Sequence, residues 1–592
     1  MPRRLFLLLC LSALYAASSH SQPAPLFETR AVWFATVLGD GGWPASTLDT
    51  PAKQADDLRD RIRTAHALGM NTFIFQAVAR GDAMYPSARL PWSARLRGPG
   101  VDPGYDPLAV AIDEAHALGM ELHVWFNVFR VGDTTTESLF AGVDDPPHVI
   151  HAHPEWVQFV DGSPWIDPSS DEARAWLVDN VMEIVEGYDL DAIHFDFIRY
   201  PAGGLTEDGA AFQFNPRGFD LIDDWRRDNV TRFVRDVYAR VLAVKPWVKI
   251  GSAPLGNYEP FPGAWPALWA FTDVFQESRR WLQEGLHDYL APQLYFDIGR
   301  TPEPGNDVDS PDFDYLVRDW VSGAGGLPIF AGLGPFKSIV REEILAQIDT
   351  TRVAGAQGQA FFRYDHLLAI ADDLAVAYPH PALPAPMTHR FEATVPTAPA
   401  LRDDLVTTSF RLAWTASAGS ATDPVRAYAV FMRSGSPPEA VPADLVAVVP
   451  ATATTWEGIR YDVPPDPPDY FRVAALSRLG MLSTLSPAVS TDDLIVTGTE
   501  DAGTPDPVRL TALYPNPASS TLRLVFSLGD TRPVTVMLTD LLGRRARTYE
   551  AGLRGPGVHT LVLDVSGLAS GVYLGRFEAG DRHVVRRVVI LH

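Results

Sequence analysis

Over its first 380 residues the chain alternates short apolar runs with longer segments of mixed polarity. The short runs are typical of strands buried on both faces, and the longer segments fit helices that cover such strands. Two stretches, AHALGMNTFIFQ from Ala65 and AHALGMELHVWF from Ala115, repeat one join: a helix end, a glycine suited to a left-handed cap, and a buried strand. Strands are predicted at residues 28–37, 71–78, 121–128, 191–197, 248–253, 288–295, 327–332 and 358–363. Helices are predicted at about 52–68, 106–118, 171–187, 217–243, 273–285, 311–322 and 339–354.

Eight strands that alternate with helices fit a closed barrel better than an open sheet. The predicted fold is therefore α/β, a (β/α)8 or TIM barrel over residues 26–380, with an active site at the C-terminal ends of its strands. No GxGxxG or GxxxxGK pattern follows a predicted strand, so a nucleotide-binding fold has no support.

The character of the chain changes near residue 380, where several prolines mark a linker. Short alternating strands follow over residues 392–490, for example FRLAW from Phe410 and AYAVFMR from Ala427. A tryptophan on an early strand and tyrosines on later ones resemble a fibronectin type III sandwich. A second linker, acidic and rich in Thr, Gly and Pro, ends at Pro507. The barrel is thus expected to be followed by two all-β sandwich domains.

Residues 507–592 form the last predicted domain, a small β-sandwich. It opens with LYPNPA from Leu513, continues with VTVMLTDLLG from Val534 and closes with the basic strand VVRRVV from Val584. These features closely resemble the C-terminal sorting domain of type IX secretion cargo. The resemblance implies the type IX secretion machinery as a partner, export through the periplasm, and a protein that is secreted or held on the outer-membrane surface.

The N-terminal segment, residues 1–21, is typical of a signal peptide. Arg3 and Arg4 precede an apolar run from Leu5 to Ala17, and small residues follow it. The run is too short to span a membrane, and no other stretch is long and apolar enough, so no transmembrane segment is expected in the mature chain. The single cysteine, Cys10, lies inside this segment, which excludes disulfides and thiol chemistry from the mature protein.

Polar and aromatic side chains gather at the C-terminal ends of the predicted barrel strands, where barrel enzymes carry their sites. Rings stack on the apolar face of a pyranose, while amides and carboxylates bond its hydroxyls, so this mixture is typical of a sugar site. A single ring is more often a core residue, but the same bias on successive strands favours a site. The candidate substrate-binding residues are Trp33, Gln76, Arg80, Asp82, Trp125, Asn127, His194, Tyr200, Gln293 and Tyr295.

The strand ends also resemble one known family, the glycosyl-hydrolase-like family 10. The similar segments are ETRAVW from Glu28, FQAVARGDAMY from Phe75, WFN from Trp125, HPEW from His153, WIDP from Trp165, DAIHFD from Asp191 and DYLAPQLY from Asp288. The resemblance covers the whole barrel and implies an exported carbohydrate-active hydrolase, with cell-wall glycan among the substrates. The chain departs from the family at Phe197, where the family has the second residue of an Asp-Asp pair. It also has Gln276-Glu277-Ser278 in place of the family's Gln-Asp-Trp.

Glycoside hydrolysis commonly uses two carboxylates across the scissile bond, one as acid and one as nucleophile or base. Asp196 is the first candidate, because the tip of the fourth strand points into the mouth of the barrel. The alternative is that Asp196 only orients His194 or Arg199 by hydrogen bonding. Glu277 is the second candidate, although it could instead cap its helix or face solvent. The carboxylates ranked behind these are Asp82, Asp297 and Glu259.

Other chemistries have less support. His148, His151 and His153 are spaced by three and two residues in a loop between prolines, which is not the spacing of a zinc site. Ser252 lacks the nucleophile-elbow pattern of a serine hydrolase. Neither a metal nor a cofactor is expected. The formal net charge of −24 argues against a nucleic-acid or anionic-membrane partner, because either would require a basic face.

Two functions of different classes remain open. The leading hypothesis is a secreted glycoside hydrolase that acts on a polysaccharide or peptidoglycan glycan by two-carboxylate acid–base catalysis. The alternative is a non-catalytic carbohydrate-binding surface protein on a degenerate barrel, which Phe197 and the lost ring at Ser278 motivate. Two carboxyl groups that face one cleft about 5–10 Å apart would favour the enzyme. A lone Asp196 in an aromatic groove would favour binding alone.

Overall fold

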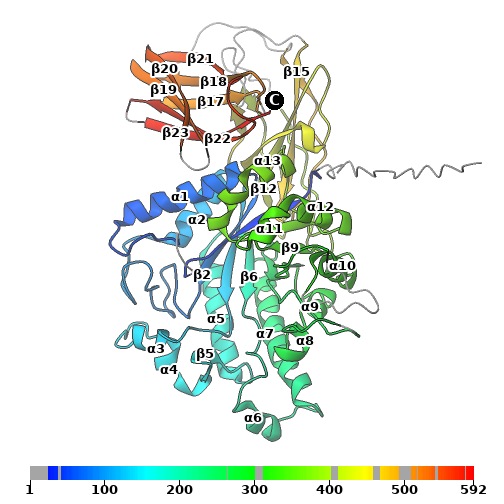
Figure 1. Cartoon of the computed structure of the whole chain (residues 1–592). Coiled ribbons are helices and arrows are strands. Elements are labelled where there is room, and N and C mark those ends of the chain that lie inside the picture. Colours follow the sequence, from blue (N-terminus) through cyan, green and yellow to red (C-terminus); the bar gives the residue numbers. More distant parts are fainter. Residues whose placement is uncertain are drawn as a thin grey trace, which may run out of the picture.

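The computed structural model of this chain describes residues 24–37, 42–262, 264–299, 311–401, 411–457, 467–491, 508–516, 518–540, 544–580 and 582–591. The predicted signal peptide lies outside these described residues. A parallel barrel surrounded by helices forms the first part, and antiparallel sheets form the rest (Figure 1). The predicted fold class, an α/β barrel followed by all-β sheets, is confirmed.

Eight parallel strands form the barrel, one for each strand that the sequence predicts. Their hydrogen-bonded order is β8-β7-β6-β3-β2-β1-β10-β9, and the bridges Leu290–Ile329 and Gln293–Gly332 join the two ends of this order into a closed ring. The strands are buried nearly throughout, as parallel strands covered on both faces should be. They are β1 (Thr29–Phe34), β2 (Thr72–Val78), β3 (Glu121–Asn127), β6 (Ala192–Asp196), β7 (Lys249–Ser252), β8 (Tyr289–Leu290), β9 (Phe330–Leu333) and β10 (Gly358–Phe362).

Helices cover the outside of the barrel and begin where the sequence supplies caps. Thr50 and Asp106 each accept a backbone hydrogen bond at the start of a helix whose first residue is proline. Gly69 and Gly119 end these two helices with φ angles of 90° and 72°, the left-handed conformation that glycine adopts without strain. The covering helices are α1 (Pro51–Ala67), α2 (Pro107–Ala117), α5 (Asp171–Gly187), α7 (Ile222–Val244), α8 (Ala270–Asp273), α9 (Ser278–Gln283), α10 (Phe313–Gly323), α11 (Ser338–Glu342), α12 (Ile344–Ala354) and α13 (Ala371–Ala377).

Several elements differ in extent from the prediction. Within the predicted strand 288–295 only β8 forms a continuous strand, because Pro292 has no N–H to donate, and pairing resumes as isolated bridges at Gln293. The predicted helix 273–285 is divided into α8 and α9 around Phe275, whose φ is 56°. Short elements that the sequence did not predict follow the strands on the pocket side. They are α3 (Thr136–Leu139), α4 (Val149–Ala152), α6 (Asp208–Phe214), the hairpin β4 (Val157–Val160) and β5 (Ser163–Ile166), and the 3-10 helices η1 (Pro154–Trp156) and η2 (Tyr364–Ile370).

The middle domain (residues 392–490) has one sheet in which β11 pairs with β14 and a second with the order β13-β12-β15-β16. Trp414 and Tyr428 pack between the sheets with ring centroids 5.2 Å apart. This arrangement is compatible with a fibronectin type III domain, and that assignment stays a prediction. The elements are β11 (Arg411–Ala413), β12 (Val425–Ser434), η3 (Pro442–Asp444), β13 (Leu445–Pro450), β14 (Thr455–Glu457), β15 (Asp469–Ser477) and β16 (Val489–Ser490).

The last domain (residues 507–592) also pairs two antiparallel sheets, with the orders β17-β18-β21 and β20-β19-β22-β23. Its apolar core lies between them and includes Leu522, Phe526 and Phe577. The strands are β17 (Val508–Tyr514), β18 (Thr521–Leu528), β19 (Arg532–Asp540), β20 (Arg545–Arg554), β21 (Gly557–Asp564), β22 (Gly571–Ala579) and β23 (Arg582–Ile590).

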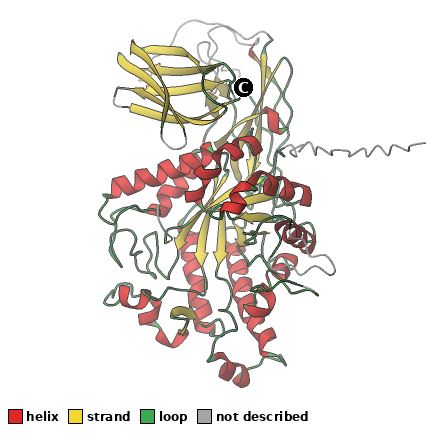
Figure 2. Ribbon diagram, viewed as in Figure 1, coloured by secondary structure: helices red, strands yellow, loops and turns green. Residues whose placement is uncertain are grey.

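Both β-domains lie at the N-terminal ends of the barrel strands, whose arrows point away from them (Figure 2). Arg426 of the middle domain donates to the carbonyl of Gly119 at 3.0 Å, at the turn that precedes β3. The N–H of Val572 in the last domain donates to Asp372 of α13 at 3.0 Å. The C-terminal strand ends therefore lie at the opposite end of the barrel from both domains.

Candidate active site

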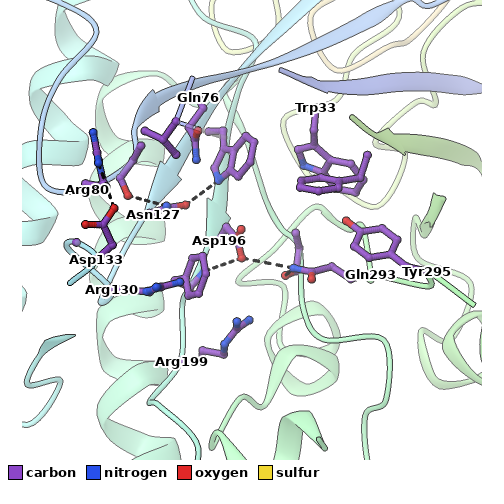
Figure 3. A pocket seen from close by; sticks show the side chains of 17 residues that line it. Trp33, Gln76, Arg80, Asn127, Arg130, Asp133, Asp196, Arg199, Gln293 and Tyr295 are labelled. Atoms are coloured by element: carbon purple, nitrogen blue, oxygen red, sulfur yellow. Dashed lines mark hydrogen bonds and ion pairs between the residues drawn. The ribbon is translucent and has the colours of Figure 1, made fainter. Parts of the chain in front are cut away.

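A pocket of about 330 Å³ opens at the C-terminal ends of the barrel strands (Figure 3). Seven of the ten predicted substrate-binding residues line it: Trp33, Gln76, Arg80, Trp125, Asn127, Gln293 and Tyr295. Asp196, the first catalytic candidate, lines it as well. The fold thus brings most of the residues that were predicted from the strand ends to one pocket.

Asp196 is the last residue of β6 and lies between the two walls of the pocket (Figure 3). One carboxylate oxygen accepts from the Phe197 N–H at 2.7 Å and from the Gln293 amide at 3.5 Å. The residue is only 8% exposed. Burial raises the pKa of Asp196 above its ordinary value, although the charge of Arg199 and the Phe197 N–H work in the opposite direction. A carboxyl group that holds its proton more tightly than usual suits an acid catalyst.

The first wall of the pocket is formed by arginines and one further carboxylate. Arg80 pairs with Asp133 at 3.1 Å. Burial works to raise the pKa of Asp133, but hydrogen bonds from Thr135 and Arg80 outweigh it and bring the pKa to about 2. The pocket therefore holds two carboxyl groups whose environments move their pKa values apart, as in many acid–base pairs.

Phe197 stands in this wall between two further arginines. The guanidinium groups of Arg130 and Arg199 lie 5.1 and 4.6 Å from the centre of its ring. Its φ is 47°, which a non-glycine residue rarely adopts and which places strain beside Asp196. Because Arg80 is paired with Asp133, Arg130 and Arg199 face a single remaining pocket carboxylate, Asp196, and the wall carries a positive excess.

The second wall is aromatic and its rings are held in fixed orientations. Tyr295 and Phe362 stack with centroids 5.4 Å apart, and Trp33 meets Phe362 edge-on at 6.0 Å. The Trp125 indole donates to Asn127 at 2.8 Å, so this asparagine positions a ring as well as lining the pocket.

Two amides of the pocket keep hydrogen-bonding capacity. Gln76 accepts from the Thr36 N–H through Oε1 at 2.9 Å, and Gln293 donates to the Ala253 carbonyl through Nε2 at 3.1 Å. Among the residues that the structure describes, nothing else binds the Nε2 of Gln76 or the Oε1 of Gln293. Both atoms can therefore bond a sugar hydroxyl.

His194 lies beneath the pocket rather than in its lining, and it holds Trp33. The Trp33 indole donates to His194 Nε2 at 2.9 Å, and His194 Nδ1 contacts the Tyr289 hydroxyl at 2.9 Å. Tyr289 contacts His123 Nδ1 at 2.8 Å, and His123 Nε2 contacts Glu121 at 3.0 Å. An indole only donates and a carboxylate only accepts, so the bonds all run one way, from Trp33 to Glu121. Burial holds the pKa of His194 well below its ordinary value, which agrees with the neutral ring that this chain of bonds requires.

Replacing His194 by phenylalanine should loosen Trp33, because its indole N–H and the Tyr289 hydroxyl lose their shared partner. We expect each unsatisfied buried group to cost about 1–3 kcal/mol in the free energy of unfolding. The affinity for a glycan, the ligand that the sequence predicts, should fall as well when it is measured by calorimetry. The matched control is His287→Phe, another fully buried histidine, whose ring bonds only the neighbouring Leu286 carbonyl. Equal glycan affinity in both variants would contradict the positioning role of His194.

Besides His194, three predicted site residues lie outside the pocket lining. Asp82 is buried and accepts from the Arg80 backbone N–H at 3.0 Å, so it shapes the loop that carries Arg80. Tyr200 is buried against Phe275, and its hydroxyl accepts from Asn229 at 2.9 Å. Glu277 is the residue before α9, where it accepts from Arg280 at 3.1 Å and from Thr231 at 3.4 Å. Its role as second catalytic carboxylate stays a prediction that the pocket does not support.

Sequence reasoning missed Arg130, Asp133 and Phe362 as pocket residues, and named Arg199 only as a strand-end residue. Arg130 and Asp133 follow β3 by three and six residues, so the signal was their place in a loop after a barrel strand rather than on the strand itself. The positive wall could not be seen without the fold, because its arginines come from different loops.

The three histidines of the loop after β3 have separate partners. His148 contacts the Arg80 carbonyl, His151 the Glu137 carbonyl and His153 the Glu155 carboxylate. Within the described part of the chain, no cluster of three or more His, Cys, Asp or Glu residues is arranged to hold a metal ion.

Comparisons with known proteins agree with the barrel and its strand-end residues. The family model for glycosyl hydrolase-like 10 matches residues 28–311. Glycosyl hydrolase YngK of Bacillus subtilis is 33% identical over 401 residues, which cover 63% of this chain and 76% of that protein. The chain belongs to the glycosyl hydrolase-like 10 family. Glycosyl hydrolase DigH of Escherichia coli K12 is 31% identical over 310 residues, which cover 49% of this chain and 69% of that protein.

Among solved structures, the barrel of this glycosyl hydrolase-like 10 protein is similar to α-L-fucosidase isoenzyme 2 from Paenibacillus thiaminolyticus. The sequence identity is 14% and the TM-score is 0.39, over 60% of this chain and 49% of that one. The assignment of the barrel fold rests on the closed ring of eight strands described above.

The last domain matches the model of the secretion system C-terminal sorting domain over residues 512–591. This glycosyl hydrolase-like 10 protein is therefore exported by type IX secretion and is secreted or located at the cell surface. Within the described residues, no helix is long and apolar enough to cross a membrane. We call residues 507–592 the sorting domain from here on.

Proposed function

We propose that this protein is an exported glycoside hydrolase that cleaves a polysaccharide or peptidoglycan glycan. Asp196 donates a proton to the glycosidic oxygen and later takes one from water, and Asp133 is the carboxylate that stays ionised. The observation that carries the proposal is the pocket itself, in which a buried carboxyl group with a raised pKa lies between an aromatic wall and an arginine wall. The names of YngK and DigH, both glycosyl hydrolases, support the same class of reaction.

The pocket residues have separable tasks in this reaction. Trp33, Trp125 and Tyr295 offer faces on which a pyranose ring can stack, and the free amide atoms of Gln76 and Gln293 can bond its hydroxyls. Asp196, protonated before bond cleavage, would donate to the departing oxygen, and its carboxylate would later take a proton from water. Asp133, held ionised by Arg80 and Thr135, would stabilise the positive charge that develops on the sugar ring.

The positive excess of the first wall favours a glycan that carries acidic groups. Arg130 and Arg199 stack on Phe197, and each has one buried guanidinium nitrogen that finds no hydrogen-bond partner among the described residues. A carboxylate on the sugar would supply that partner, since arginine binds carboxylates through paired hydrogen bonds.

A panel of glycans with mass analysis of the products tests the proposed function on the full mature chain. Each acidic glycan of the panel should be included with its carboxyl groups intact and with these groups reduced to alcohols. We expect cleavage of at least one intact acidic glycan and weaker cleavage of its reduced form. Binding without any cleavage across the panel would instead favour the alternative, a carbohydrate-binding surface protein, which the presence of Phe197 at the family's acidic position motivates.

Variants of three residues identify the second carboxylate. Asp133→Asn should lower turnover strongly if Asp133 is the ionised partner, whereas Glu277→Gln should change turnover little because Glu277 does not line the pocket. Arg80→Gln is the matched control, since it breaks the same ion pair but keeps the carboxylate. Equal changes in KM and turnover for Asp133→Asn and Arg80→Gln would assign Asp133 to holding Arg80.

A further inference from the structure

The middle domain contacts the barrel with side chains that a free-standing sandwich would not need. In the sheet β13-β12-β15-β16, Tyr428, Val430 and Val473 face the other sheet of the domain. The alternate positions, which a separate module would expose to water, are apolar too. They are Ala427, Ala429, Phe431, Ala474 and Leu476, and they form a second buried cluster with Leu26, Phe27 and Leu383 of the segments that flank the barrel.

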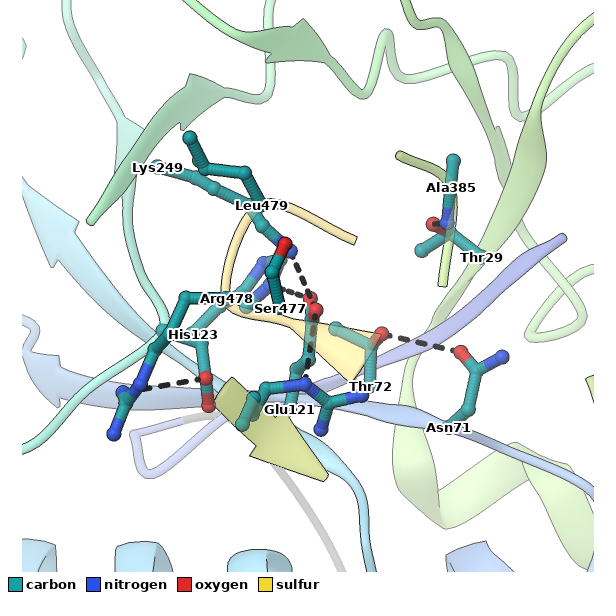
Figure 4. Close-up of polar contacts among 12 residues, drawn as sticks. Thr29, Asn71, Thr72, Glu121, His123, Lys249, Ala385, Ser477, Arg478 and Leu479 are labelled. Carbon is teal, nitrogen blue, oxygen red and sulfur yellow. Dashed lines mark hydrogen bonds and ion pairs between the residues drawn. The ribbon is translucent and has the colours of Figure 1, made fainter. Parts of the chain in front are cut away.

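A turn of the middle domain enters the N-terminal end of the barrel (Figure 4). Leu479, fully buried, packs in the cluster that fills the barrel interior together with Ile74, Tyr289 and Phe330. Its carbonyl accepts from the Met387 N–H at 2.8 Å, and its own N–H donates to Asp423 at 2.9 Å. Leu479 therefore completes a core that begins at the pocket with Trp33 and Trp125.

The backbone of the middle domain also lies very close to the backbone of the barrel and of the segment that follows it. A Cβ atom on Gly119 would lie 2.5 Å from the carbonyl oxygen of Val448 in β13, and one on Gly480 would lie 2.8 Å from the Cα of Pro386. Both glycines have positive φ angles of 72° and 85°. The two surfaces are thus fitted to one another at backbone distance.

Buried charges at this end of the barrel also receive partners from the middle domain. Asp191, fully buried, lies 3.6 Å from Arg478, which pairs with Asp189 at 2.6 Å as well. Glu121 pairs with Lys249 of β7, and Arg426 approaches it to 3.8 Å. Lys249 and His116 are their partners within the barrel, and the arginines of the middle domain add to the neutralisation of these buried carboxylates.

From these observations we propose that the middle domain is the floor of the catalytic barrel and not a separable accessory module. Barrel and floor fold and unfold as one cooperative unit, while the sorting domain unfolds by itself. Glu121 is also the end of the hydrogen-bond chain from Trp33, so the floor contacts the last member of the chain that positions a pocket ring.

Hydrogen exchange of the full mature chain in increasing urea, read by mass spectrometry, tests the proposal without any need for activity. Peptides from β6 and β15 should lose protection at one shared urea concentration, and a peptide from β18 at another. Loss of protection in β15 at clearly lower urea than in β6 would show an independent module and overturn the proposal.

Two matched variants sharpen the comparison. Val473→Ala removes volume inside the middle domain at a side chain that faces away from the barrel, and it should lower the urea midpoints of β15 and β6 equally. Leu522→Ala makes the same kind of change inside the sorting domain and should shift β18 alone. A Val473→Ala shift confined to β15, or a Leu522→Ala shift in all three peptides, would contradict a unit made of barrel and floor.

Discussion

Asp196→Asn should lower turnover of the cleaved glycan by about 10²- to 10⁴-fold, because the amide keeps the shape of the carboxyl group but can no longer transfer the proton. Glycan affinity should change little, since the rings of Trp33, Trp125 and Tyr295 remain in place. Turnover and binding should therefore be measured on the same variant. Turnover close to that of the unchanged protein would remove Asp196 from the mechanism, and equal losses of turnover and binding would assign it to substrate positioning.

The pH dependence of turnover and of stability gives a second test of the role of Asp196. As an acid, Asp196 must be protonated, so turnover of the unchanged protein should fall as the pH rises through the raised pKa of this group. The raised pKa also means that ionised Asp196 opposes folding: the cost grows as the pH rises from the ordinary carboxyl pKa to the raised pKa, and it is complete above the raised pKa. Asp196→Asn should therefore be at least as stable as the unchanged protein near neutral pH, which separates a catalytic loss from misfolding.

The largest effect on stability is expected at Arg390, in the linker between the barrel and the middle domain. Both oxygens of fully buried Asp288 accept from Arg390 at 2.9 Å. Arg390→Met should leave the buried charge of Asp288 with His389, 3.5 Å away, and the Ile250 N–H as its remaining partners among the described residues. Loss of the arginine should cost about 3–5 kcal/mol in the free energy of unfolding. Denaturant unfolding followed by circular dichroism measures this loss.

Two further variants make the Arg390 result interpretable. Adding Asp288→Asn to Arg390→Met should recover most of the loss, because no buried charge then remains. Arg59→Met breaks an exposed pair with Asp56 and should change the free energy of unfolding little. A similar small effect for Arg390→Met would show that water reaches Asp288 in the folded protein.

Low pH should destabilise the N-terminal end of the barrel, where Asp288 and Glu121 are buried. Burial works to raise the pKa of Asp288, but the hydrogen bond from His389 and the charge of Arg390 outweigh it and hold the pKa below its ordinary value. Burial likewise opposes the lowering at Glu121, where Lys249 dominates and brings the pKa to about 2. Both carboxyl groups bind protons more weakly in the folded chain than in the unfolded chain. Their contribution to the free energy of unfolding is therefore complete above the ordinary carboxyl pKa range and is lost as the pH falls toward 2.

The barrel could be predicted because each strand carries its own signal, an apolar run with polar residues at one end. The same signal placed Trp33, Gln76, Trp125 and Gln293 at one face, since parallel strands end at the same edge. Arg130 and Asp133 carry no such signal, because loop length does not fix where a side chain points. Glu277 shows the reverse: it keeps an acid where the family has the Asp of Gln-Asp-Trp, but the local backbone directs it toward Arg280 and Thr231.

The packing of the middle domain against the barrel could not be predicted from the sequence either. Leu479 stands in a turn between strands, where a leucine does not by itself indicate a partner. The apolar residues of β12 indicate a strand buried on both faces, but they do not show what covers the second face. Only the fold shows that this cover is the segments flanking the barrel and that Leu479 fills its interior.

The sorting domain contacts α13, while the pocket opens at the far end of the barrel. A molecule held on the bacterial envelope by its final domain would consequently turn its binding face toward the surrounding medium. Polymers too large to pass through the envelope could then reach the pocket directly. Removal of the sorting domain would change where the protein works and would leave the shape of its pocket unaltered.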